Sequence, residues 1–312
     1  MNDRGVIVLS RHWHTRTAEL AFATRSIAGA ATRCCPVSVL VPGTAGQREP
    51  DGAFDLMGIG ENGVLQWPDG LSPDSTVVVD EVTVEFGTLL SQVAPRRVLY
   101  LSASADGFDP AWRRLELAGD DPSFSVNVHV PVNPLARLHR HHGFGFTGYQ
   151  LVLSDGSGSP NEPPSAAAWL SSAFADADVV VVEAAIASAW RGRALRGSVA
   201  VDTRMDLWRL MAHANACIDL APGPHVAREC IEALRFGTPI IVPASSGPGA
   251  VHARASGGAV FFDERDLLSA ARTFRDAANR SAASDAGRRY ADARYGDAGA
   301  LVTRVRALLD EA

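Results

Sequence analysis

The chain of 312 residues contains no lysine: all 29 of its basic side chains are arginines, against 35 aspartates and glutamates. A lysine-dependent phosphate-binding loop of the GxxxxGK[ST] type is therefore excluded. Enzymes that form a Schiff base through lysine, and protein kinases with their strand lysine, are excluded as well. Arginine can replace lysine in binding phosphate but hardly as a nucleophile or base, because its pKa stays above about 12. A GC-rich genome that favours arginine codons is a simpler explanation of the bias.

Cysteine and long apolar runs are scarce too. The four cysteines, at 34, 35, 217 and 230, form no CxxC pair, which fits a reduced, cytoplasmic compartment. The apolar run near the N-terminus is too short for a signal peptide, and no stretch approaches the ~18 apolar residues of a membrane span. The net charge of −6 argues against a nucleic-acid partner. We expect a cytoplasmic protein without a transmembrane segment.

What the chain does contain is an alternation of short aliphatic runs and longer helical patterns. Continuous apolar strands that alternate with helices indicate parallel sheets covered on both faces. At about 150 residues per domain, the length suggests two domains. The predicted strands are 5–10, 36–41, 54–59, 76–80, 97–101, 125–130, 149–154, 178–183, 198–201, 216–220, 239–242 and 259–262. The predicted helices are 17–32, 88–93, 165–174, 204–213, 226–236, 264–279 and one from about 285.

Between the two halves, the run LHRHHGFGFTG (138–148) mixes histidine and glycine without a period, and is typical of a linker. We therefore predict an N-terminal Rossmann-like domain over 1–143, a second over 144–284, and a C-terminal helix over 285–312 that packs back on the first. The spacing of His139, His141 and His142 matches no ligand motif, so we expect no metal site. An arginine run at 191–196 is interpreted as a solvated loop, with contacts to a nucleotide or an anionic acceptor as the alternative.

The segment with the most chemical information is Asp219–Phe262, where a strand ends in a Pro-Gly-Pro turn and a helix follows directly. The backbone at Gly223 and the free N–H groups of His225, Val226 and Ala227 would then face the carboxyl edge of the sheet, where open α/β sheets bind ligands. A helix N-terminus placed there is an anion site. A plain helix start, hydrated by water, is the alternative. Glu232 could accept hydrogen bonds from ribose hydroxyls, or be a solvated helix residue.

The runs EALRFGTPIIVP, SGGAVFF and DERDLLSAARTF resemble the donor half of GT-B glycosyltransferases of family 4. The resemblance covers 149–274 and, more thinly, 5–43. It implies two Rossmann-like domains facing a cleft and a nucleotide diphosphate sugar held mainly by the second. In that family two glutamates stand eight positions apart, the second on the ribose. Here the second is Glu232, whereas Pro224 stands at the position of the first.

The family's diphosphate-binding arginine and lysine, and its N-domain histidine, have no counterparts in this chain. The matching loop at 154–165 has neither cation, although Ser157 and Gly158 could donate hydrogen bonds to a diphosphate there. A flexible loop is the alternative. Arg204 begins the helix before the key strand and is a further donor-site candidate.

The loop after the first strand is the second candidate region. Arg11 and Arg16 could hold a phosphate or an acidic acceptor, and His12 or His14 could act as a base near neutral pH. A polar surface loop is the alternative. We predict a metal-independent, retaining glycosyltransferase that needs no cofactor besides its nucleotide-sugar donor. The competing hypothesis is an inactive GT-B-like subunit that binds a protein partner.

Overall fold

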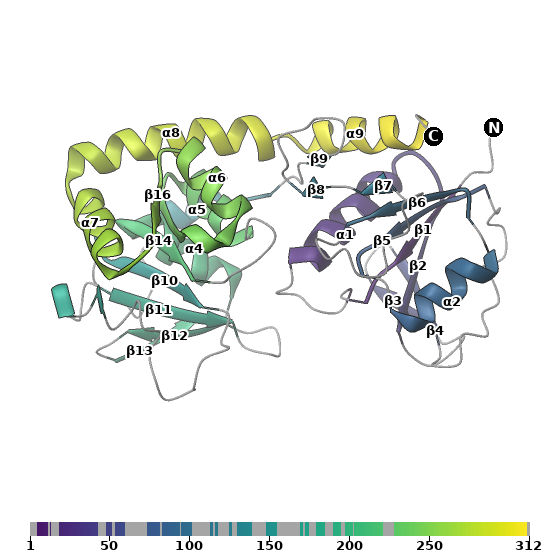
Figure 1. The fold of residues 1–312 in the computed structure, drawn as a ribbon, viewed down its shortest axis with the longest axis horizontal. Coiled ribbons are helices and arrows are strands. Elements are labelled where there is room, and N and C mark those ends of the chain that lie inside the picture. Colours follow the sequence, from purple (N-terminus) through teal and green to yellow (C-terminus); the bar gives the residue numbers. More distant parts are fainter. Residues whose placement is uncertain are drawn as a thin grey trace. The chain divides into compact units, whose positions relative to one another are not determined.

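The computed structural model describes most of the chain. The described residues are 5–11, 13, 19–42, 48–51, 54–59, 74–81, 83–93, 95–101, 113–114, 116–117, 125–126, 130–138, 148–154, 169–170, 172–174, 179–184, 190–194, 197–201, 203–220 and 228–310. They form two compact units (Figure 1). Unit 1 comprises Met1–His129 with Asp297–Ala312, and unit 2 comprises Val130–Gly296.

Unit 1 is built on a seven-stranded sheet in the order β3-β4-β2-β1-β5-β6-β7. Its parallel strands are β1 (Val6–Leu9), β2 (Val37–Pro42), β4 (Phe54–Ile59), β5 (Thr76–Val79), β6 (Arg97–Tyr100) and β7 (Arg113–Arg114). The edge strand β3 (Arg48–Asp51) runs antiparallel to β4. The pair β8 (Glu116–Leu117) and β9 (Ser125–Val126) forms a separate two-stranded sheet.

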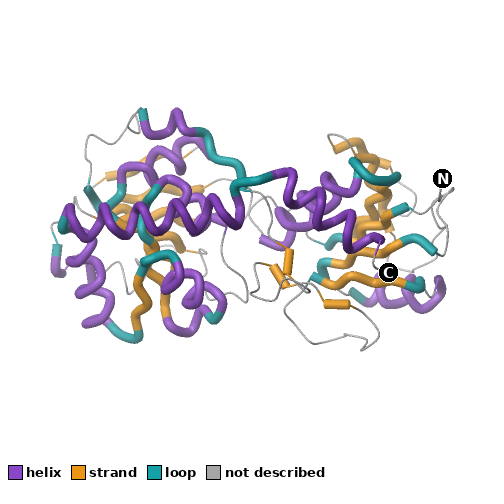
Figure 2. The backbone as a smooth tube through the Cα atoms, turned by 90° about the horizontal axis from the view of Figure 1, so that it is seen from above, coloured by secondary structure: helices purple, strands orange, loops and turns teal. Residues whose placement is uncertain are grey.

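The sheet of unit 1 is apolar on both faces, as a doubly wound fold requires. Val6 and Val8 of β1 point into a core shared with helices α1 (Glu19–Ala31) and α9 (Ala298–Asp310). Ile7 and Leu9, the alternate residues of β1, point into a second core with helix α2 (Val84–Val93). Figure 2 shows the chain from above with its helices and strands distinguished by colour. The C-terminal helix is thus part of the core of unit 1.

Unit 2 repeats this plan with a second seven-stranded sheet, in the order β13-β12-β11-β10-β14-β15-β16. The parallel strands are β10 (Gln150–Ser154), β11 (Val179–Ala184), β14 (Ala216–Asp219), β15 (Ile240–Pro243) and β16 (Ala259–Phe261). Strands β12 (Trp190–Ala194) and β13 (Gly197–Val201) pair antiparallel at one edge.

Two groups of helices accompany this sheet. Leu267, Ala271 and Phe274 of α7 are buried in one core with residues of β10, β11, β14 and β15. Helices α4 and α5 bury their own apolar side chains. The bounds are η1 (Pro134–Arg137), α4 (Arg204–His213), α5 (Arg228–Phe236), η3 (Ala244–Ser246), α6 (Pro248–Ala255), α7 (Glu264–Arg275) and α8 (Ala277–Tyr295).

The predicted α/β class with two mainly parallel sheets is confirmed. The interpretation of 191–196 as a loop is wrong for 191–194, because Arg191 and Arg193 lie in β12, while 195–196 lie outside the described residues. The single helix predicted over 264–279 is also wrong. Asp276 has an extended backbone and accepts a hydrogen bond from Asn279 N at 2.9 Å, so it ends α7 and caps α8.

Candidate functional site

The carboxyl edge of the unit 2 sheet contains its topological switch point. Strand β10 is flanked by β11 on one side and by β14 on the other, with Leu153 opposite Asp219. Ligands of open α/β sheets bind in the crevice where the strand order reverses in this way. Helix α5 follows β14 in the chain, so its first turn belongs to this edge.

Helix α4 supplies the first charged side chain of the site. Thr203 caps the helix: its hydroxyl accepts from Asp206 N at 3.2 Å, and the Asp206 carboxylate accepts from Thr203 N at 3.1 Å. This reciprocal capping box fixes where the helix begins. Arg204 is therefore held at the first helical position.

Helix α5 is buried on nearly every side. All of its residues except Arg228 and Arg235 are buried, the two glutamates included. Gly237 ends the helix with a φ of 77°, and the amides of Gly237 and Thr238 donate to Leu234 O and Ala233 O. This is the left-handed C-terminal cap that the sequence predicts for Gly237. Two buried carboxylates in such a helix need partners.

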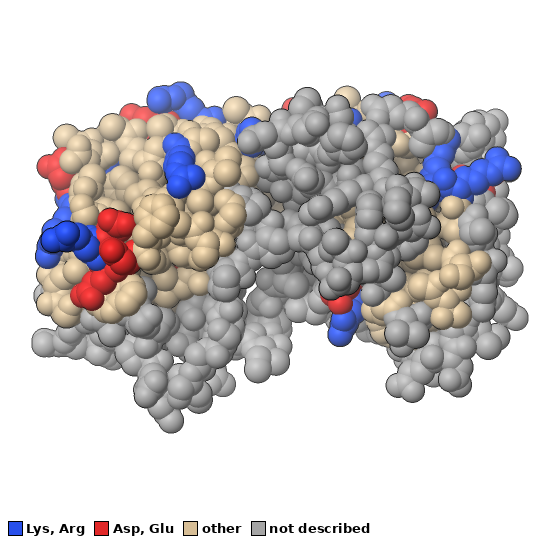
Figure 3. Space-filling view, viewed as in Figure 1, with Lys and Arg blue, Asp and Glu red and all other residues tan. Residues whose placement is uncertain are grey.

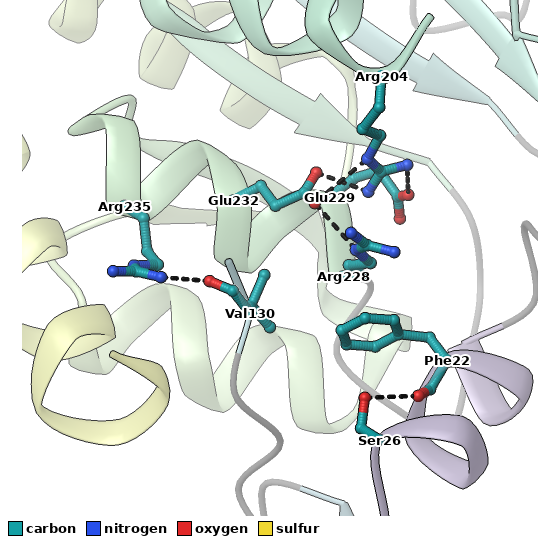
Figure 4. Close-up of polar contacts among 8 residues, drawn as sticks. All are labelled: Phe22, Ser26, Val130, Arg204, Arg228, Glu229, Glu232 and Arg235. Atoms are coloured by element: carbon teal, nitrogen blue, oxygen red, sulfur yellow. Dashed lines mark hydrogen bonds and ion pairs between the residues drawn. The ribbon is translucent and has the colours of Figure 1, made fainter. Parts of the chain in front are cut away.

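Those partners are two arginines (Figure 4). Glu232, with no exposed surface, accepts from Arg204 through both oxygens, at 3.2 Å from Nε and 2.5 Å from Nη2. Arg228 Nε donates to Glu232 Oε1 at 2.9 Å. Arg204 Nη1 also pairs with Glu229 at 2.8 Å. We call these four side chains, Arg204, Arg228, Glu229 and Glu232, the α5 charge network.

The α5 charge network carries two positive and two negative charges, and its four side chains are largely buried from solvent. Burial raises the pKa of Glu232, while Arg204 and Arg228 oppose the shift. Burial would lower the pKa of Arg204, but Glu229 and Glu232 outweigh it and the pKa is raised. The pKa of Arg228 is lowered, first by burial. The network is neutral as a whole, so it offers no net positive charge to a diphosphate.

The geometry also limits what Glu232 can still bind. A carboxylate has about four acceptor positions. The arginines occupy three of them, two on Oε1 and one on Oε2. Glu232 therefore has room for one further hydrogen bond, at Oε2.

Next to the network lies a pair of buried thiols. Cys230 Sγ donates to Asp219 Oδ2 at 3.4 Å, and Cys217 lies in the same strand as Asp219. Burial first, and the neighbouring carboxylates second, raise the pKa of both thiols well above the usual range. Both cysteines therefore stay protonated and unreactive in the folded protein.

The carboxyl edge of unit 1 is organised around Asp80. Ser10 donates to Asp80 Oδ2 at 2.5 Å, and Arg11 N donates to Asp80 Oδ1 at 3.0 Å. The Arg11 side chain forms an ion pair with Glu81. Trp13, in a segment predicted to be a polar loop, is fully buried and donates to Asp51 at 2.8 Å.

Among the predicted site residues, the structure describes Arg11, Arg204 and Glu232, and it brings the last two into direct contact. Sequence reasoning missed Arg228 and Glu229. Arg228 stands four positions before Glu232, a helical spacing that predicts an ion pair. The other predicted residues lie outside the described part of the chain: His12, His14, Arg16, Ser157, Gly158, Gly223, His225, Val226 and Ala227.

Within the described residues there is no group of three or more histidine, cysteine, aspartate or glutamate side chains that could hold a metal ion. Nor does that part of the chain include a helix long and apolar enough to cross a bilayer. Figure 3 shows arginine and acidic side chains together on the visible surface of the described residues.

No family model and no curated protein matches the chain. Solved structures do. HepE from Anabaena, in complex with UDP and glucose, is similar with a TM-score of 0.66 and 13% identity, over 98% of this chain and 99% of that one. WaaG, a glycosyltransferase involved in lipopolysaccharide biosynthesis, is similar with a TM-score of 0.63 and 17% identity, over 99% of this chain and 100% of WaaG. An α,α-trehalose 6-phosphate synthase from Burkholderia multivorans is similar with a TM-score of 0.61 and 11% identity, over 99% of both chains. The chain thus has the GT-B fold.

Proposed function

We propose that this GT-B protein is a glycosyltransferase whose donor is a nucleotide diphosphate sugar, bound at the start of α5 in unit 2. The observation that carries the proposal is Glu232, a carboxylate held in one orientation at the switch-point edge of the sheet. HepE, whose structure holds UDP and glucose, has a similar fold, and this supports a nucleotide-sugar donor.

Glu232 has a positioning role in this proposal. Three of its acceptor positions are filled, so in this proposal a ribose hydroxyl takes the remaining one, at Oε2, and the fully buried side chain becomes accessible when the donor binds. Arg204 and Arg228 oppose the rise that burial causes in the pKa of Glu232, and they fix the orientation of its carboxylate, so that little ordering is left to the moment of binding. We therefore expect a ribose contact that is specific in geometry but adds only one hydrogen bond to the affinity for the donor.

The positive potential for the diphosphate comes from elsewhere, because the α5 charge network is neutral. We propose the backbone N–H groups of His225, Val226 and Ala227 for this task. Donors aimed at the departing diphosphate stabilise the charge that develops as the glycosidic bond breaks. Retention of configuration and independence from metal follow from the resemblance of EALRFGTPIIVP to family 4.

Calorimetric titration with UDP, GDP and ADP tests the donor site. We expect micromolar binding of one nucleotide, unchanged by EDTA. Glu232→Asp should weaken it about tenfold or more, as expected for a lost hydrogen bond to a charged group. Glu264→Gln, an exposed carboxylate at the start of α7, is the matched control. If none of the three nucleotides binds the folded wild-type protein, the proposal is refuted.

Pro224, at the position of the family's first glutamate, motivates one competing outcome. An inactive GT-B-like subunit would bind a nucleotide but release no sugar from any donor. Turnover assays with UDP-, GDP- and ADP-sugars separate this outcome from an active transferase, and NMR of the product anomer then tests retention.

A further inference from the structure

Unit 1 contains a pocket of about 440 Å³ at the amino ends of strands β1, β5 and β6. The residues just after α1 and the last turns of α9 form its other walls. Three arginines line it, Arg33, Arg97 and Arg306, together with Asp310 and the neighbouring cysteines Cys34 and Cys35. Its volume lies within the usual range for small-molecule sites.

This pocket is separate from the edge where the fold binds its substrates. Ser10 and Asp80 mark the carboxyl ends of β1 and β5, whereas Val6 and Thr76, at the amino ends, line the pocket. Four-residue strands separate the two edges by about 10 Å. A ligand in the pocket would not compete for the carboxyl-edge positions.

The charge of the pocket favours an anion. Its three arginines face one aspartate, which leaves an excess of two positive charges. Helices α1 and α9 end beside it, and each helix end contributes about half a negative charge, so the excess falls by about one. Among the described residues, neither Arg33 nor Arg306 has an ion-pair partner, and both are exposed.

Arg97 is held more firmly than the other two arginines. Its Nη1 donates to Leu309 O at 3.0 Å, which ties β6 to the end of α9. The rest of the guanidinium stays available, since arginine has five N–H donors in a fixed fork. Such forks match phosphate oxygens in pairs, and they favour a dianionic phosphate over a single carboxylate.

We propose that this pocket is a second ligand site, which binds the phosphate group of a small metabolite or free phosphate. The site goes beyond the donor and acceptor positions of the proposed transferase and does not depend on them. A phosphorylated compound bound here would link the stability of unit 1 to metabolite supply.

The cysteines provide a local readout. Cys34 and Cys35 are half-buried in the pocket wall of unit 1, whereas Cys217 and Cys230 are fully buried in unit 2 and report the unfolding of that unit. Folded protein is labelled with iodoacetamide, an uncharged reagent, and modification is followed cysteine by cysteine by mass spectrometry. Inorganic phosphate, glycerol 3-phosphate and malonate are compared at constant ionic strength.

We expect a phosphate probe at ten times its dissociation constant to slow the labelling of Cys34 and Cys35 by about tenfold. The double variant Arg33→Gln/Arg306→Gln should lose the protection, while Arg265→Gln, an exposed arginine of α7, should keep it. Without added anion, labelling of Cys34 and Cys35 no faster than in wild type shows that unit 1 of each variant is folded, and unchanged slow labelling of Cys217 and Cys230 shows the same for unit 2. Stronger protection by glycerol 3-phosphate identifies a phosphate ester as the ligand, and equal or stronger protection by phosphate identifies the free ion.

Three results would overturn the proposal: no protection by either phosphate probe, equal protection by malonate, or full protection in the double variant. Because the readout is in unit 1 and needs no nucleotide, a failure here leaves the proposed transferase function untouched.

Discussion

Replacing Glu232 by glutamine tests whether the α5 charge network stabilises unit 2. The substitution keeps the size of the side chain but leaves Arg204 and Arg228 with one remaining counter-charge, Glu229. Removing one partner of a buried ion pair costs about 3–5 kcal/mol. The arginine side chains are 24% and 21% exposed, so water recovers part of this and we expect a loss of about 2–4 kcal/mol.

Urea unfolding followed by pulsed labelling of Cys217 and Cys230 measures this loss in unit 2 alone, since both thiols are inaccessible until that unit opens. Asp285→Asn is the control. Its carboxylate is also paired with an arginine, but at the surface, where the pair is worth less than about 1 kcal/mol. If Glu232→Gln costs no more than Asp285→Asn, the network does not stabilise the unit and the reasoning fails.

A double-mutant cycle refines the test. Arg228→Gln combined with Glu232→Gln leaves Arg204 and Glu229 as a balanced pair. The double variant should therefore be more stable than the sum of the single losses predicts, by about 1–3 kcal/mol. Strict additivity would show that Arg228 and Glu232 do not interact in solution.

The remaining predictions concern packing and titration. Unit 2 should lose stability as the pH rises above about 8.5, because the pKa values of Cys217 and Cys230 are raised in the folded state and only the unfolded chain releases these protons there. Each thiol should contribute about 1 kcal/mol per pH unit; urea midpoints from pH 7.5 to 9.5 measure the slope, and a flat profile would contradict it. Trp13→Ala should destabilise unit 1 by about 3–5 kcal/mol in urea unfolding, since the side chain is fully buried; a loss below about 1 kcal/mol would contradict that burial. Gly258→Ala should cost about 1–3 kcal/mol, because the new Cβ would lie 2.5 Å from a backbone oxygen of β15. Gly29→Ala, with open space at its Cβ, should be neutral or stabilising, and equal losses in both glycine variants would refute the steric argument.

The parallel strands could be predicted because each is a continuous aliphatic run that needs cover on both faces. Phe54–Ile59 is an example in which the predicted and observed bounds coincide. The antiparallel edges were harder. The strand Trp190–Ala194 contains two arginines and a glycine, a composition that does not predict a strand. It is held as a strand by its antiparallel pairing with Gly197–Val201.

The same limit applies to the site. Glu232 could be singled out from its helical context, and Arg204 from its position at a helix start. Their contact joins residues 28 positions apart in two different helices, so no local spacing predicts it. Trp13 shows the reverse error: its neighbours in the sequence are polar, but its indole is fully buried in the core of unit 1 and has its own hydrogen-bond partner.

The release of nucleoside diphosphate from a panel of UDP-, GDP- and ADP-sugars tests the central claim most directly. Folded wild-type protein in EDTA should release one nucleoside diphosphate above the rate in buffer, and Glu232→Asp should release it more slowly while Glu264→Gln matches wild type. Absence of release from every donor, by protein that is shown to be folded, would contradict the account.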